Sequence, residues 1–91
     1  MQEITFIYAD DCLDCDRMRI MLNNAIKETG ANCTIKEINS ETKEAIDVAV
    51  EVGIEDLPGC VIGKTIMYGK RGFTYGAILK AVRLIGELKC L

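Results

Sequence analysis

Two cysteines, Cys12 and Cys15, stand at the junction between a short apolar segment and a long amphipathic one, and this junction constrains the fold more than any other feature. Residues 4–9 are mostly β-branched or aromatic and are apolar on both alternations, which predicts a strand buried on both faces. Apolar residues then recur at helical spacing over residues 12–29. The pattern predicts a strand that leads directly into a helix, with both cysteines in the first turn of that helix.

Capping residues divide the rest of the chain into short elements. Asp11 is the natural N-cap of the first helix, and Gly30 is its natural end. Ser40 or Thr42 can cap a second helix, and Thr74 can cap a third. The remaining elements expected are a strand at 32–38, a helix ending at 52, strands at 59–62 and 65–68 joined by a tight type II′ turn at Gly63-Lys64, and a final helix. The order β-α-β-α-β-β-α predicts an α/β fold with a mixed four-stranded sheet flanked by helices.

Length and composition indicate an ordinary small globular protein. The chain has 91 residues, which fits a single domain spanning residues 1–91. No uninterrupted apolar run approaches the ~18 residues that a membrane span needs. The N-terminal segment lacks the basic start and the small-residue cleavage site of a signal peptide. We therefore expect a cytoplasmic protein that does not act in a membrane.

The charges are unevenly distributed. Every acidic residue except Glu87 lies within the first 60 positions, whereas the last third of the chain is basic. Its basic side chains are dispersed and few aromatic residues accompany them, while phosphate binding requires a dense basic face. We therefore expect no nucleic-acid partner.

The chain has five cysteines and no histidine. In a reducing cytosol, unpaired thiols are normal, so the three outside the pair (Cys33, Cys60 and Cys90) are expected to be small core or surface residues. Zinc or an iron–sulfur cluster usually takes four Cys or His ligands, so two of these three would have to converge on the pair. A metal- or cluster-binding module is thus one alternative. A non-catalytic adaptor, with a redox-inert cysteine pair, is another.

The position of the pair favours redox chemistry. Cys12 lies over the first turn of the helix, where unpaired N–H groups and the positive end of the helix dipole stabilise a thiolate. Cys15 lies on the buried stripe of the same helix. Thiol–disulfide exchange needs this division, because one exposed thiolate attacks and a sheltered thiol then displaces the product. A C-x-x-C after a strand and at the start of a helix is a strong signal for such an enzyme.

The only proline, Pro58, directly precedes the third expected strand. With this Leu57-Pro58 step, the cysteine pair and the element order, nearly the whole chain resembles the thioredoxin-like superfamily, in particular the small thioredoxins and glutaredoxins of archaea and phages. The resemblance implies that Pro58 is cis and faces Cys12 and Cys15. It also implies that the Leu57 backbone pairs with an incoming substrate strand.

The resemblance further implies a function. A dithiol–disulfide oxidoreductase of this kind takes part in electron transport and cell redox homeostasis through its redox-active centre, without a bound cofactor or metal. Its partners are protein disulfides and a thiol or flavoprotein reductase that restores the dithiol. Cys12 is expected to attack and Cys15 to resolve.

The sequence departs from the two best-known branches of this superfamily. Leu13-Asp14 stands where thioredoxins commonly have Gly-Pro and glutaredoxins Pro-Tyr. The stretches that hold glutathione in glutaredoxins do not match here, so glutathione is not the partner we expect. Acidic residues, Asp11 and Asp14 among them, surround the pair and disfavour a thiolate. An oxidant is one whose thiolate form is stabilised, so these carboxylates predict a reductant.

Overall fold

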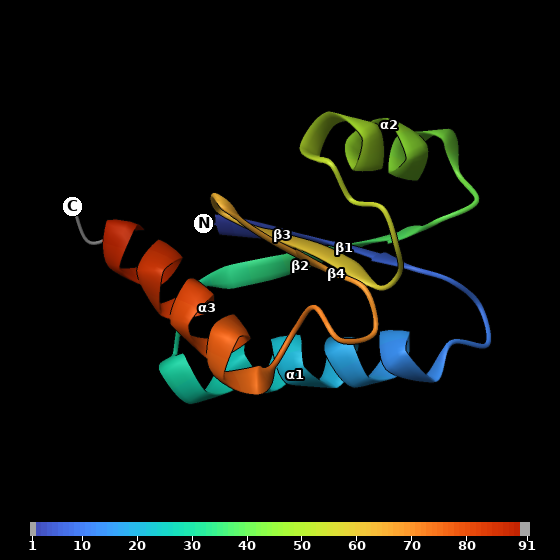
Figure 1. Cartoon of the computed structure of the whole chain (residues 1–91). Helices are drawn as coiled ribbons and strands as arrows, with labels where there is room; N and C mark the ends of the chain where they lie inside the picture. The colour runs from blue at the N-terminus through green and yellow to red at the C-terminus, as the bar shows by residue number, and fades with distance from the viewer. Residues whose placement is uncertain (1, 90–91) are drawn as a thin grey trace.

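The computed structural model describes residues 2–89. The side chains of residues 87–89 lie outside this description, as does Cys90. The elements are β1 (Gln2–Tyr8), α1 (Leu13–Thr29), β2 (Cys33–Asn39), α2 (Lys43–Val52), β3 (Gly59–Ile62), β4 (Thr65–Tyr68) and α3 (Tyr75–Lys89) (Figure 1). The order expected from the sequence is confirmed.

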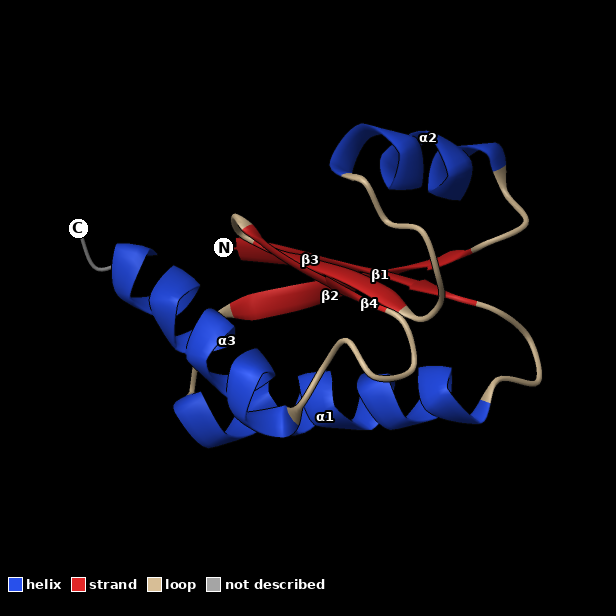
Figure 2. Ribbon diagram, in the orientation of Figure 1, coloured by secondary structure: helices blue, strands red, loops and turns tan. Residues whose placement is uncertain are grey.

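The four strands form one mixed sheet in the order β2-β1-β3-β4. β1 pairs with β2 in parallel, while β3 is antiparallel to both β1 and β4. Helices α1 and α3 cover one face of the sheet, and α2 covers the other (Figure 2). The α/β fold predicted from the sequence is therefore confirmed.

The central strand β1 contributes side chains to both faces. Ile4 and Phe6 are fully buried in the larger apolar cluster, against α1 and α3. Ile7, which is one position out of phase, is buried in the smaller cluster with Ala45 of α2. This arrangement explains why residues 4–9 are apolar on both alternations, since a central strand meets a helical layer on each side.

The ends of the elements follow the predicted chemistry, with one exception described below. The Thr42 hydroxyl accepts a hydrogen bond from the backbone N–H of Ala45 and caps α2, and Thr74 caps α3 in the same way. Gly63 has a φ of 61° and Lys64 does not have a positive φ, as a type II′ turn requires. Among the described helices, none is both long and apolar enough to cross a membrane.

Candidate active site

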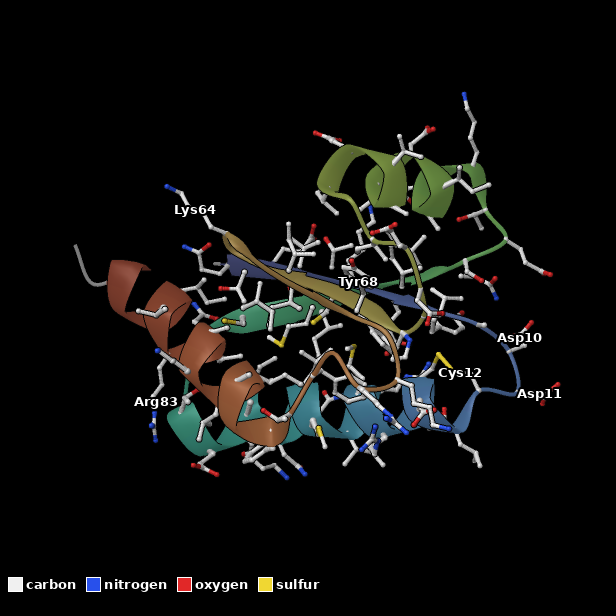
Figure 3. All side chains as sticks on the ribbon, in the orientation of Figure 1. Asp10, Asp11, Cys12, Lys64, Tyr68 and Arg83 are labelled. Carbon is white, nitrogen blue, oxygen red and sulfur yellow. A yellow bond between two sulfur atoms is a disulfide. The ribbon has the colours of Figure 1, made fainter. Side chains whose placement is uncertain are left out.

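The cysteine pair lies at the N-terminus of α1. Cys12 itself is the N-cap residue, and its Sγ accepts a hydrogen bond of 3.1 Å from the backbone N–H of Cys15. The prediction that Asp11 caps this helix is wrong. Asp11 adopts a left-handed conformation (φ 53°), which a short polar residue tolerates, and its side chain points outward from the loop (Figure 3). The sulfur of Cys12 therefore takes the capping position.

The two sulfurs have different surroundings. Cys12 and Cys15 are joined by a disulfide with Cα atoms 5.2 Å apart. Cys15 is fully buried in the larger cluster, whereas Cys12 is only half-buried. Leu13, one of the two residues between them, has 86% of its surface exposed. Cys12 is thus partly exposed and Cys15 is sheltered, which agrees with the division expected from the sequence.

Pro58 lies at the end of the sheet from which the chain leads to the cysteines. The Leu57-Pro58 peptide bond is cis, which confirms this part of what the resemblance implies. The next residue, Gly59, is paired with Ile7 near the end of β1. On the other side, the carbonyl of Pro58 accepts a hydrogen bond of 2.9 Å from Gly69. Pro58 is therefore held between β1 and the loop that follows β4.

The residue before this proline already has a hydrogen-bonding partner. The backbone N–H of Leu57 donates to Oδ1 of Asp56 at 2.8 Å. Leu57 is half-buried and packs against both apolar clusters, and Cys12 packs against the larger of them. Leu57 thus links the surroundings of the disulfide to the α2 face of the sheet.

Arg17 ties the start of α1 to the loop between β4 and α3. Its guanidinium donates to Oδ1 of Asp14 at 3.3 Å and to the backbone carbonyl of Lys70 at 3.1 Å. It also lies over the ring of Phe73, 4.7 Å from the ring centre. This anchoring role of Arg17 could not be predicted from the sequence pattern. The spacing between Asp14 and Arg17 is the usual one for a helical ion pair, but nothing local indicates the contact with Lys70.

The carboxylates near the cysteines fall into two groups. Asp14 is paired with Arg17 and Asp16 with Arg19, at 3.3 and 2.7 Å. Asp10 and Asp11 make no ion pair with any described residue. Asp10 accepts a hydrogen bond of 3.3 Å from Nδ2 of Asn39, and the side chain of Asp11 points away from the molecule in Figure 3. The acidic character that the sequence predicts around the pair therefore rests mainly on these two exposed aspartates.

The other described cysteines lie away from the exposed part of the site. Cys60 is fully buried in β3, and burial raises the pKa of its thiol from 9.0 to about 12, although a backbone hydrogen bond from Met67 acts in the opposite direction. Such a thiol is not a nucleophile near neutral pH. Cys33 is half-buried at the start of β2. Within the described part of the chain, no group of three potential metal ligands comes together.

A second contact that the sequence did not reveal holds the loop before Pro58. The hydroxyl of Tyr68, on β4, donates to Oε1 of Glu55 at 3.1 Å (Figure 3). The two residues are 13 positions apart, and only the pairing of β3 with β4 brings them together. This hydrogen bond fixes the loop that carries Asp56 and Leu57.

Comparisons with known proteins identify the fold. No protein-family model matches the chain, and no curated protein sequence matches it significantly. Among solved structures, an uncharacterised thioredoxin-like protein from Clostridium perfringens matches with a TM-score of 0.72 and 20% identity, over 92% of this chain and 70% of that one.

Two further structures are similar. The glutaredoxin-like protein NrdH-redoxin from Escherichia coli matches with a TM-score of 0.57 and 22% identity, over 84% of this chain and 93% of its own. Thioredoxin-2 of the malaria parasite matches with a TM-score of 0.60 and 13% identity, over 90% of this chain and 81% of its own. At these levels of identity the likeness establishes the fold, which is thioredoxin-like.

Proposed function

We propose that this protein is a dithiol–disulfide oxidoreductase that reduces disulfides in other proteins. The observation that carries the proposal is the Cys12–Cys15 disulfide at the N-terminus of α1, with Cys12 only half-buried and Cys15 fully buried. The backbone N–H of Cys15 already points at the sulfur of Cys12 and favours a thiolate there after reduction. Structural similarity to NrdH-redoxin, whose activity profile is described as thioredoxin-like, agrees with this chemistry.

The reaction has two exchange steps. The thiolate of Cys12 attacks one sulfur of the substrate disulfide, forms a mixed disulfide and expels the other substrate sulfur as a thiolate, which takes up a proton. Cys15 then loses its proton and attacks the sulfur of Cys12, which expels the second substrate sulfur. Two electrons and two protons have passed to the substrate, and the Cys12–Cys15 disulfide remains. A thiol or flavoprotein reductase restores the dithiol by the reverse exchange.

Leu57 and Pro58 dock the substrate in this proposal. An extended substrate strand pairs with the backbone of Leu57, next to the disulfide, by strand addition. Asp11 and Asp14 tune the cysteines by disfavouring the thiolate, so the protein works as a reductant. Since Arg17 is paired with Asp14, the contribution of Asp11 is expected to be the larger.

Insulin reduction with dithiothreitol as electron donor tests the proposal, and the measured quantity is the rate of insulin precipitation. We expect the wild-type protein to accelerate precipitation and Cys12→Ser to abolish the acceleration. Cys15→Ser should accumulate a mixed disulfide between Cys12 and the substrate, detectable by mass spectrometry. The matched control is Cys33→Ser, a cysteine far along the chain from the pair, which should leave the rate unchanged.

Two outcomes would contradict the proposal. One is a wild-type rate equal to that of dithiothreitol alone. The other is full activity in Cys12→Ser, which would mean that the reaction does not use this pair. Binding of one metal ion per chain that Cys12→Ser eliminates would favour a metal-binding module instead.

A further inference from the structure

An open pocket of about 260 Å³ lies between α2, the end of β1 and the loop that leads to Pro58. Its walls include Ile46 and Val50 of α2, Ile7 of β1, and Leu57. Ile46 and Val50 have 54% and 79% of their surfaces exposed, which is unusual for large apolar side chains beside a cavity. We call this cavity the α2 pocket. It is large enough for one apolar side chain of a partner.

The charged residues that line the α2 pocket are both acidic. Glu55 and Asp56 belong to its wall, and neither makes an ion pair with any described residue. Arg17, a cation at the start of α1, is engaged elsewhere, with the backbone carbonyl of Lys70 and the ring of Phe73. A partner that enters the α2 pocket therefore meets uncompensated negative charge.

Docking of a substrate strand would release the carboxylate of Asp56 from its present hydrogen bond. The backbone N–H of Leu57 is now bonded to the carboxylate of Asp56 at 2.8 Å. A strand that pairs with Leu57 must supply its own carbonyl to that N–H and displace the carboxylate. The displaced carboxylate of Asp56 is then free to accept other hydrogen bonds, and a lysine or arginine on the incoming strand would be its strongest donor.

We propose that the α2 pocket takes an apolar side chain of the substrate protein, while Glu55 and Asp56 pair with a lysine or arginine beside it. The inference rests on the proposed function and adds a substrate class to it: disulfides in extended, basic segments that carry an apolar residue near the reactive cysteine. Leu57 connects the α2 pocket with the surroundings of the disulfide, because it lines the pocket and packs against the same apolar cluster as Cys12.

Four synthetic peptides test this specificity. Each peptide holds one cysteine as a mixed disulfide with thionitrobenzoate. One position near the cysteine is leucine or serine, and the position beside it is lysine or glutamate, which gives four combinations. The thiolate of Cys12 attacks the peptide sulfur, and the S–S bond to thionitrobenzoate breaks and releases the coloured anion, which measures the rate. Cys15 then displaces the peptide thiol. A second set of four, with the varied positions on the other side of the cysteine, is measured in the same way.

We expect the peptide with leucine and lysine to react fastest with the reduced protein. A partly buried leucine should contribute about tenfold over serine, and replacing glutamate by lysine about threefold to tenfold. The charge effect should shrink in high salt, and the leucine effect should not.

Three variants locate the effect. Val50→Lys puts a cation at the mouth of the α2 pocket and should remove the advantage of both leucine and lysine. The double variant with Glu55→Gln and Asp56→Asn should remove the lysine advantage but keep the leucine advantage. Ile20→Lys is the matched control, because Ile20 is an apolar residue with 60% exposure on α1. It should retain both preferences.

The outcomes separate this inference from the proposed function. Equal rates for all four peptides, with rapid reaction of the small disulfide dithiobis-nitrobenzoate, would overturn the inference and leave the function standing. No release from any probe beyond that of Cys12→Ser would overturn both. Dimerisation on size-exclusion chromatography that Val50→Lys abolishes would assign the α2 pocket to a second copy of the chain and overturn the inference as well.

Discussion

The two faces of the sheet differ in how completely their helices cover them. On the α1 and α3 face, α1 alone contributes four buried residues, and the larger cluster joins both helices to β1 and β3. On the opposite face, Ala45 is the only residue of α2 that is buried, and the smaller cluster contains four buried residues. The first face is built for stability. The second leaves apolar side chains exposed beside an open pocket, which suits recognition.

The disulfide lies between the densely packed face of the sheet and the more exposed one. Cys15 belongs to the densely packed cluster, so its position is fixed by the same contacts that hold the fold together. Cys12 is half-exposed and packs against the larger cluster, and Leu57 packs against both clusters. Firm support from one face and an exposed apolar surface on the other would both serve the proposed exchange with a substrate disulfide.

Truncation of one apolar side chain on each face tests directly how the two faces differ in stability. Leu22→Ala removes a fully buried side chain of α1 and should lower the free energy of unfolding by about 3 kcal/mol. Ile46→Ala on α2, where the side chain is 54% exposed, should cost less than about 1 kcal/mol. Urea denaturation followed by circular dichroism measures both. Equal losses would mean that the two faces contribute alike to stability.

A second prediction uses the buried thiol of the densely packed face. The pKa of Cys60 is raised from 9.0 to about 12 in the folded protein, so above pH 9 the unfolded state loses this proton and the folded state keeps it. The stabilisation is complete below pH 9 and should decline by up to about 1.4 kcal/mol per pH unit between pH 9 and 12.

Cys60→Ala isolates this contribution. Urea denaturation of the reduced proteins should show a shallower loss of stability above pH 9 for the variant than for the wild type, although the variant is less stable at pH 7. Tyr68 and Tyr75, whose pKa values are raised chiefly by hydrogen bonds to Glu55 and Glu28, are present in both proteins and cancel in the comparison. Parallel pH profiles would refute the assignment.

The smallest effect concerns the connection between α1 and the loop that follows β4. Arg17→Gln removes the ion pair with Asp14, the hydrogen bond to Lys70 and the contact with Phe73. Since the side chain is 48% exposed, solvent screens these interactions and the expected loss is about 1 kcal/mol or less. Hydrogen exchange should nevertheless increase in residues 69–74.

The matched control for Arg17 is Arg83→Gln. Arg83 is 59% exposed and lies 3.8 Å from Glu28, its only ion-pair partner among the described residues. Its replacement should change neither the stability nor the exchange of residues 69–74. If both variants behave alike, Arg17 does not anchor the loop.

Most of the fold could be predicted from local sequence patterns. The double alternation of residues 4–9 predicted a central strand, and the helical stripe that includes Cys15 predicted its burial, because both depend only on which side of an element a residue lies. In β2, Ile35 and Ile38 are three positions apart and so lie on opposite faces of the strand. They pack against different clusters, one on each face of the sheet. Such patterns depend only on residues that are close together in the sequence.

The remainder depended on backbone detail and on distant contacts. Asp11 fits the usual preferences for an N-cap, but its left-handed conformation passes the capping position to Cys12. Lys70 lies 53 positions from Arg17, and Tyr68 meets Glu55 only because two strands pair. The α2 pocket arises from where α2 settles on the sheet, which no local pattern specifies.

Whether the protein is a protein-disulfide reductant can be decided from the midpoint potential of the Cys12–Cys15 pair, measured by thiol trapping and mass spectrometry in dithiothreitol redox buffers. A single two-electron transition at about −250 to −280 mV, in the range of thioredoxin, is the predicted result for a protein-disulfide reductant. A value near −200 mV or above, at about the potential of glutaredoxins or oxidants, would contradict the assignment as a reductant. If no Cys12–Cys15 disulfide forms at any potential, the redox function itself is refuted.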